Sequence, residues 1–170
     1  MPAVTQLMLV GICSDTHDNL DLVDAAVDYF TQQDVDAVVH CGDVVAPFSA
    51  TPFDAPFDFF AVRGNNDGEW NLQNAIAEFG TYLGEMGALE FDGVDVAVYH
   101  GTSEDVVDAL LGCGDYDYVF RGHTHERVHE EREGTAHVNP GGLPIPGADD
   151  EYSVATLDTE TGDVEFQKMG

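Results

Sequence analysis

The chain has 170 residues, a length typical of one domain, and 44% of them are hydrophobic, so a core can form without a disulfide or a structural metal. Asp and Glu total 33 against five Lys and Arg, which gives a formal net charge of −28 at pH 7. The acidic residues are spread along the sequence between apolar ones, which excludes an acidic low-complexity tail. The charge also argues against nonspecific binding to nucleic acid, which needs basic residues opposite the phosphates. We therefore expect one folded domain over residues 1–170.

Hydrophobic periodicity predicts alternating strands and helices, followed by antiparallel strands. The apolar run 7–13 is the first strand, and a helix follows whose apolar face carries Leu20, Val23, Val27 and Phe30. A second strand completes a βαβ unit, which favours a parallel sheet. Prolines break the next connection and leave at most a short helix there. The second strand of the βαβ unit is at 35–40. The later elements are a strand at 57–62, a helix at 69–78, a hairpin of 89–91 and 94–99 around Asp92–Gly93, a helix at 103–111, a strand at 116–120, and the strand pairs 127–133 with 135–138 and 152–157 with 163–168.

Cysteine usage and the apolar segments indicate where the chain resides. Cys13, Cys41 and Cys113 are an odd number without CxxC spacing, which argues against a disulfide framework and fits a reducing compartment. The run 7–13 is short and lacks a basic flank, so it is a poor signal peptide and a good buried strand. Since no stretch has the length needed to span a membrane, we expect a soluble, cytoplasmic protein.

Polar residues able to bind a metal follow five of the predicted strands. They are Asp15 with His17, then Asp43, then Asn65 with Asn66 and Asp67, then His100, and finally His123 with His125. Residues i and i+2 of an extended segment point the same way, so Asp15 and His17 could hold one ion. In open α/β sheets, ligands bind at the carboxyl ends of the strands. Each motif alone also occurs in ordinary turns, but five of them at strand ends, with oxygen and imidazole donors and no thiolate, favour a metal site.

These motifs together resemble a known family. In order they are Asp15-x-His17, Gly42-Asp43, Gly64-Asn65-x-Asp67, His100-Gly101 and Gly122-His123-x-His125, and they extend over nearly the whole chain. The set resembles the calcineurin-like metallophosphoesterases, and the flanking segments 14–19, 62–65 and 139–142 resemble the compact, YfcE-like phosphodiesterases within that family. The resemblance implies an α/β fold, namely a four-layer αββα sandwich of two mixed sheets flanked by helices.

The same resemblance implies two divalent metal ions. One ion would be held by Asp15, His17, Asp43 and His125, and the second by Asp43, Asn65, His100 and His123, so that Asp43 would bridge them. Carboxylate and carbonyl oxygens mixed with imidazoles suit Mn²⁺ as the first expectation, with Ni²⁺, Zn²⁺, Fe and Co²⁺ as alternatives. Two dications against two ligand carboxylates would leave a formal charge of about +2, a positive focus on an acidic surface.

The implied reaction is hydrolysis of a small-molecule phosphodiester by a hydroxide that bridges the metals, with Asp43, Asn65, Asn66 and Arg63 as catalytic residues. For Arg63 the sequence leaves two roles open, a contact with the substrate or a surface ion pair. Many relatives have His where this chain has Asn66, and an asparagine cannot act as a general acid. We therefore expect esters with acidic leaving groups, or a proton donated by water.

Other functions stay open on the sequence alone. The same fold resembles a retromer subunit, a non-catalytic binding scaffold whose metal residues have partly eroded, whereas here the ligand set is intact. A nuclease resembling the DNA-repair members would need further domains and a DNA-binding surface, which this acidic chain does not provide. A phosphomonoesterase or a protein phosphatase would use the same metal centre, and a homo-oligomer is compatible with the sequence.

The acidic composition also resembles that of proteins from salt-accumulating halophilic archaea. At molar salt the Debye length is about 3 Å, so repulsion between carboxylates is largely screened. In dilute buffer the same repulsion strains the folded state. We therefore expect a halophilic protein whose fold loosens when the salt concentration is low.

Overall fold

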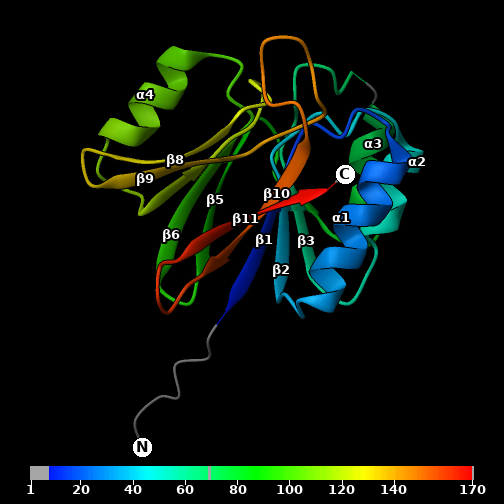
Figure 1. Ribbon diagram of the computed structural model, residues 1–170, viewed down its shortest axis with the longest axis horizontal. Coiled ribbons are helices and arrows are strands. Elements are labelled where there is room, and N and C mark those ends of the chain that lie inside the picture. The colour runs from blue at the N-terminus through cyan, green and yellow to red at the C-terminus, as the bar shows by residue number, and fades with distance from the viewer. Residues whose placement is uncertain (1–7, 69, 170) are drawn as a thin grey trace, which may run out of the picture.

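The computed structural model describes residues 8–68 and 70–169 and forms two stacked β-sheets with helices on both outer faces (Figure 1). The predicted order of helices and strands is confirmed, while Leu7 and Glu69, where two predicted elements begin, lie outside the described residues. Sequence periodicity did not indicate the two-residue strand Thr81–Tyr82 or the 3₁₀ turn Thr51–Phe53. The elements are β1 (Leu9–Cys13), α1 (Leu20–Gln32), β2 (Ala37–His40), α2 (Pro47–Ala50), β3 (Asp58–Ala61), α3 (Trp70–Ala77), β4 (Thr81–Tyr82), β5 (Met86–Phe91), β6 (Val94–Tyr99), α4 (Glu104–Gly112), β7 (Tyr118–Phe120), β8 (Arg127–Arg132), β9 (Thr135–Pro140), β10 (Tyr152–Asp158) and β11 (Val164–Met169).

Both sheets are mixed. The six-stranded sheet has the order β11-β10-β1-β2-β3-β4, in which β1 to β4 are parallel and β10 runs antiparallel to β1. The five-stranded sheet has the order β5-β6-β7-β9-β8, with β6, β7 and β9 parallel between two antiparallel edge strands. In each sheet the parallel strands are neighbours, so their carboxyl ends lie at the same end of the sheet, where ligands bind in α/β proteins.

Three layers of apolar side chains hold the four layers of backbone together. The alternation of side chains along a strand sends every second residue to the opposite face of its sheet. On β1 and β2, Val10, Ile12 and Val39 face the second sheet and pack against residues such as Val98 and Phe120. The outer face of the six-stranded sheet packs on α1 and α3, and Val107 and Leu111 of α4 pack on the outer face of the five-stranded sheet. This is the αββα sandwich that the family resemblance implies.

Local signals explain where particular elements begin and turn. Asn19 precedes α1, and its side-chain oxygen accepts a hydrogen bond from the backbone N–H of Leu22 at 3.2 Å, which satisfies one of the free donors at the helix start. The hairpin between β5 and β6 turns through Asp92 (φ 50°) and Gly93 (φ 81°). Two consecutive positive φ angles define the type I′ turn that an Asp-Gly pair favours, and the predicted hairpin is confirmed.

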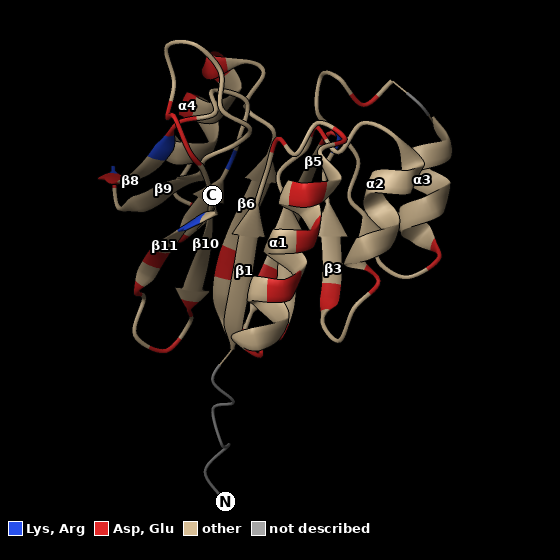
Figure 2. Cartoon of the chain, turned by 45° about the vertical axis from the view of Figure 1, so that its right-hand side comes forward, with Lys and Arg blue, Asp and Glu red and all other residues tan. Residues whose placement is uncertain are grey.

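Acidic residues lie on helices, on strands and in the loops between them (Figure 2). On α1, Asp21, Asp24 and Asp28 lie away from the apolar face that Val23 and Phe30 bury against the sheet. The few cations are paired with carboxylates in the described part of the chain. Within residues 8–68 and 70–169, none of the helices has the length and apolarity that crossing a bilayer requires.

Candidate metal centre

The seven residues expected to bind metal lie together at the carboxyl edge of both sheets. Asp15 and His17 follow β1, Asp43 follows β2 and Asn65 follows β3, all in the six-stranded sheet. The five-stranded sheet contributes His100 directly after β6, and His123 and His125 after β7. Because the two sheets stack with these edges side by side, residues more than a hundred positions apart in sequence meet at one place.

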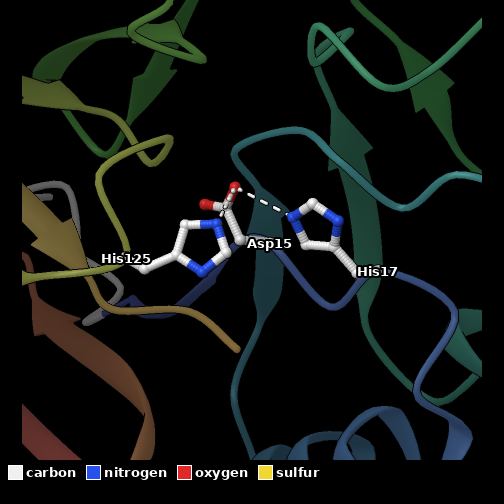
Figure 3. A group of neighbouring side chains, drawn as sticks. All are labelled: Asp15, His17 and His125. Carbon is white, nitrogen blue, oxygen red and sulfur yellow. Dashed lines mark ion pairs between the residues drawn. The ribbon is translucent and has the colours of Figure 1, made fainter. Parts of the chain in front are cut away.

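Asp15 lies at the centre of the histidines. Its Oδ1 atom is 3.4 Å from Nε2 of His125, 3.6 Å from Nε2 of His17 and 3.8 Å from Nε2 of His100. Figure 3 shows the imidazoles of His17 and His125 on two sides of the same carboxylate. The other oxygen, Oδ2, accepts the backbone N–H of His123 at 2.9 Å, which fixes the carboxylate in place. One oxygen of Asp15 therefore points at three imidazole nitrogens while the other is held by the protein.

Asp43 lies between two of the same histidines. Its Oδ2 atom is 3.3 Å from Nε2 of His17 and 3.3 Å from Nε2 of His100. Asn66 donates its backbone N–H to Oδ1 at 2.9 Å and its side-chain amide to Oδ2 at 3.0 Å. Burial raises the pKa of Asp43, but the bonds from His100 and Asn66 outweigh it and hold that pKa well below the usual range, so Asp43 is an anion at neutral pH.

Asn65 completes a second group of donors. Its Oδ1 atom lies 3.0 Å from Nε2 of His100 and 3.2 Å from Nδ1 of His123. His100 is thus shared, because Asp43 lies on one side of its Nε2 atom and Asn65 on the other. The atoms of Asp15, His17 and His125, and separately those of Asp15, Asp43 and His100, all lie within 4.8 Å of one another, close enough to hold an ion.

Backbone carbonyls determine which nitrogen of two histidines can bind a metal. Nδ1 of His100 lies 2.7 Å from the carbonyl oxygen of Cys41, and Nδ1 of His125 contacts the carbonyl oxygen of Leu143. A carbonyl oxygen only accepts, so each Nδ1 carries the proton and donates it. In the neutral ring, Nε2 is then left with a lone pair directed at the carboxylates, the arrangement found in histidines that bind metal.

The backbone is in the left-handed region at five of these residues. The φ angles are 52° for Asp15, 45° for His17, 62° for Asp43, 74° for His123 and 62° for His125. Each such residue costs roughly 1–2 kcal/mol, and residues in this region gather at functional sites. The expected extended geometry between Asp15 and His17 is therefore wrong, because both residues have left-handed φ angles. The backbone nevertheless directs both side chains to one point.

Asp67 holds two of the loops that carry the cluster. Its Oδ2 atom accepts the backbone N–H groups of Asp43 at 2.9 Å and Gly64 at 2.7 Å, and its Oδ1 atom accepts that of Val45 at 2.7 Å. Burial raises the pKa of Asp67, and the amide donors partly offset this effect. The carboxylate thus ties the loop after β2 to the loop after β3, which sets the position of Asp43 relative to Asn65.

The arrangement fits divalent metal ions. Among the described residues, Asp15 Oδ1 and His17 Nε2 are buried polar atoms that lack a hydrogen-bond partner, and such atoms are costly unless something binds them. The nearby carboxylate of Asp15, 3.6 Å from Nε2, and the charge of Asp43 raise the pKa of His17 despite its partial burial. The carboxylates therefore attract positive charge, which a bound cation supplies in place of a proton. Carboxylate and amide oxygens with imidazole nitrogens are donors that first-row metals accept.

The structure places Arg63 in an ion pair. Its Nη1 atom is 2.6 Å from Oε1 of Glu85, and its Nε–H donates to the carbonyl oxygen of Asp67 at 3.0 Å. The hydrogen bond and charge of Glu85 raise the pKa of Arg63. Of the two roles that the sequence left open, the ion pair is formed, and Arg63 also lines a cavity with Asn65.

Arg121 was missed by sequence reasoning. It is buried just before the Gly122-His123 turn, and its guanidinium donates to the carbonyl oxygens of Gly101 at 3.0 Å and Gly122 at 3.1 Å. Nη1 and Nη2 also bond both carboxylate oxygens of Glu104, at 3.2 and 2.8 Å. Arg121 therefore fastens the residue after His100 to the residue before His123. The available signal was an arginine at the end of a buried strand, which requires partners inside the fold.

The fold and this cluster agree with comparisons to known proteins. Residues 8–162 match the model of the calcineurin-like phosphoesterase superfamily domain, and the chain belongs to this family. It is 34% identical to phosphodiesterase MJ0936 of Methanocaldococcus jannaschii, over 90% of this chain and 94% of that protein. It is 27% identical to phosphodiesterase YfcE of Escherichia coli, over 91% of this chain and 89% of that protein.

Solved structures show the same fold. A novel archaeal phosphodiesterase superimposes with a TM-score of 0.89 at 32% identity, covering 95% of this chain and all of the other. Vps29 of Chaetomium thermophilum superimposes with a TM-score of 0.68 at 15% identity, with 95% of each chain covered, and this likeness concerns the fold alone. The resemblance to the family inferred from the motifs is thereby confirmed.

Proposed function

We propose that the chain is a metal-dependent phosphodiesterase with a centre for two divalent ions. The position of Asp43 carries the proposal, because one carboxylate oxygen lies 3.3 Å from Nε2 of both His17 and His100 and can be shared by two ions. One ion would be held by Asp15, His17, Asp43 and His125, and the other by Asp43, Asn65, His100 and His123. Both groups combine oxygen and imidazole donors, for which Mn²⁺ is our first expectation, followed by Ni²⁺, Zn²⁺, Fe and Co²⁺.

The relatives named as phosphodiesterases support the type of ester. MJ0936 is 34% identical to this chain over 90% of this chain's length, and the name of MJ0936 assigns it to the phosphodiesterases. When bound, the ions would supply the activated water and the positive charge that hydrolysis at phosphorus requires. The chain's own residues hold the donors in place, since Asp67 ties the loops of Asp43 and Asn65 together and Arg121 ties those of His100 and His123.

Asn66 determines which leaving groups we expect. Its side-chain amide donates to Asp43 at 3.0 Å, so it positions a metal-binding carboxylate and has no acidic proton for the leaving oxygen. Diesters whose leaving group is already acidic, such as aryl esters, should therefore react best, with water as the proton source for others. The substrate would be a small molecule, since the net charge of −28 disfavours long polyanions.

We further propose a single cytoplasmic domain adapted to high salt. The apolar layer between the sheets joins residues from β1, β2, β6, β7 and β10 in one core, as in a single folding unit. Cys13, Cys41 and Cys113 are free thiols, which fits a reducing compartment. The composition of 33 acidic and five basic residues supports adaptation to salt.

The direct test combines a substrate panel with a count of bound metal. Purified protein loaded with Mn²⁺ or Ni²⁺ in high KCl would be offered aryl phosphodiesters, aryl phosphomonoesters and cyclic nucleotides, and metal content would be measured by elemental analysis. We expect diester hydrolysis and two ions per chain. Asp43→Ala should lose both, whereas Asp24→Ala, on the exposed face of α1, should keep both.

Each contrary result has a definite meaning. Undiminished activity in Asp43→Ala would overturn the assignment of the centre. If the protein prefers monoesters, the proposed phosphodiesterase function is replaced by that of a phosphomonoesterase or protein phosphatase. Metal binding without hydrolysis of any ester would favour a scaffold.

A further inference from the structure

A cavity of about 340 Å³ lies beside the candidate metal centre. Its walls come from the loop after β3, the residue before β5, the end of β6 and the segment before α4, and they consist of Arg63, Gly64, Asn65, Glu85, Tyr99 and Thr102. The volume is within the range of about 300–1,000 Å³ that small-molecule sites occupy in proteins.

The cavity shares a wall with the metal centre. Asn65 lines it, and the Oδ1 atom of the same residue is 3.0 Å from Nε2 of His100 and 3.2 Å from Nδ1 of His123. A phosphoryl group bound at Asn65 and His100 therefore has this cavity next to it. A diester carries two organic substituents on phosphorus, and the cavity can receive one of them.

The charges at the cavity cancel. Arg63 is the cation among the described residues that line it, and its guanidinium is already paired with Glu85 at 2.6 Å. The side chain of Glu85 is 70% exposed, so this carboxylate stands at the solvent side of the pair. A substituent with its own negative charge would have to approach Glu85 and compete with it for Arg63. An uncharged substituent meets neither penalty.

The remaining walls suit a ring with polar groups. Tyr99 is half-buried, and its hydroxyl oxygen accepts the backbone N–H of Ser103 at 3.2 Å, which holds the ring in one orientation. An aromatic side chain held in this way offers a flat apolar contact at little entropic cost. The hydroxyl of Thr102 and the amide of Asn65 offer hydrogen bonds around it.

We propose that this cavity binds an uncharged cyclic substituent of the phosphodiester, and that the Arg63–Glu85 pair selects against substituents that carry additional negative charge. Aryl groups and nucleosides share this chemistry, and both fit the proposal. The inference rests on the proposed phosphodiesterase function for its relevance to catalysis, but it also predicts binding that does not depend on turnover.

Hydrolysis of four 4-nitrophenyl diesters tests the proposal. Their second substituent is methyl, phenyl, thymidine joined through its 5′-oxygen, or thymidine 3′-phosphate joined in the same way, and the phenyl compound distinguishes an aryl from a nucleoside preference. Assays in about 1 M KCl leave a Debye length of about 3 Å, so the acidic surface is screened and contact-range charges at the cavity dominate. We expect kcat/KM to be about tenfold or more higher for a cyclic substituent than for methyl, and about tenfold lower again when the 3′-phosphate is added.

Variants assign these ratios to named residues. Glu85→Gln should reduce the discrimination against the 3′-phosphate by about tenfold, whereas Glu90→Gln, on the exposed side of β5, should leave it unchanged. Tyr99→Ala should remove most of the preference for a ring over methyl, and Tyr99→Phe, which keeps the ring, should retain it. Equal kcat/KM for methyl and cyclic substituents, or an unchanged 3′-phosphate ratio in Glu85→Gln, would overturn the proposal.

A binding measurement separates this proposal from the proposed function. Calorimetry with the methyl ester of thymidine 5′-phosphate and with its 3′-phosphorylated counterpart should show weaker binding of the second, and Glu85→Gln should narrow the difference. If no diester is hydrolysed yet this binding pattern holds, the phosphodiesterase proposal fails and the cavity assignment stands. If the methyl diester is hydrolysed but the two ligands bind equally, the cavity assignment fails alone.

Discussion

Replacing Arg121 with methionine removes the guanidinium between the two histidine loops while nearly keeping the side-chain volume. Four hydrogen bonds are lost, to Gly101, to Gly122 and to both oxygens of Glu104. Their loss is unequal in free energy. Gly122 still accepts a hydrogen bond from the side chain of Asn139 at 3.2 Å, and Glu104 is 61% exposed and becomes hydrated.

The buried carbonyl of Gly101 accounts for most of the expected loss of stability. Leaving a buried acceptor without a donor costs about 1–3 kcal/mol. Losing a pair with an exposed carboxylate adds up to about 1 kcal/mol. The free energy of unfolding should therefore fall by about 1–4 kcal/mol, and the melting temperature by about 2–16 °C for a chain of this size. Because His100 and His123 lose their common support, metal affinity should fall by about 10- to 100-fold.

Urea unfolding and metal titration by calorimetry measure the two effects. Arg132→Met is the matched control, since Arg132 is 42% exposed and pairs with Asp108 and Glu130 at the surface. We expect the control to lose at most about 1 kcal/mol and to bind metal normally. If Arg121→Met is destabilised no more than Arg132→Met, the carbonyl contacts do not support the fold. If it is destabilised but binds metal normally, Arg121 does not position the histidines.

Salt, acid and a substitution at Asn66 test three other features of the chain. The melting temperature should rise between dilute buffer and about 1 M KCl, where carboxylate repulsion is screened, and a flat profile would refute this effect of the acidic surface. Burial lowers the pKa of His40 from 6.5 to about 4, so the folded state resists protonation there. The contribution of His40 to the free energy of unfolding is complete above about pH 6.5 and decreases by up to about 3 kcal/mol as the pH falls toward 4. In urea unfolding, His40→Gln should therefore lose less stability than the unmodified chain over this pH range. If His40→Gln loses stability just as steeply, groups other than His40 cause the loss of stability in acid. Asn66→His should raise the turnover of alkyl diesters by about 100-fold or more if a missing acid limits them, and unchanged turnover would show that it does not.

The sequence by itself determined the order of the elements and the types of donor at the strand ends. The periods of apolar residues in 9–13, 20–32 and 94–99 are local signals, and the Asp92–Gly93 turn is another, so these elements were predicted. The short strand β4 was missed because two residues carry no period, and it is formed by pairing with Phe60 and Ala61 of β3.

Tertiary structure decided how the donors face one another. Asp15 and His17 meet through left-handed backbone angles that the spacing of an extended chain did not predict, and their backbone N–H groups donate to the carbonyls of Gly42 and Asp43 in the loop after β2. The free nitrogens of His100 and His125 depend on the carbonyls of Cys41 and Leu143, which are distant in the sequence. Arg121 likewise has partners that only the folded chain brings near it. Donor identity is a property of single residues, but hydrogen bonding in a buried site is a property of contacts between distant segments, and so it appears only when both sheets are assembled.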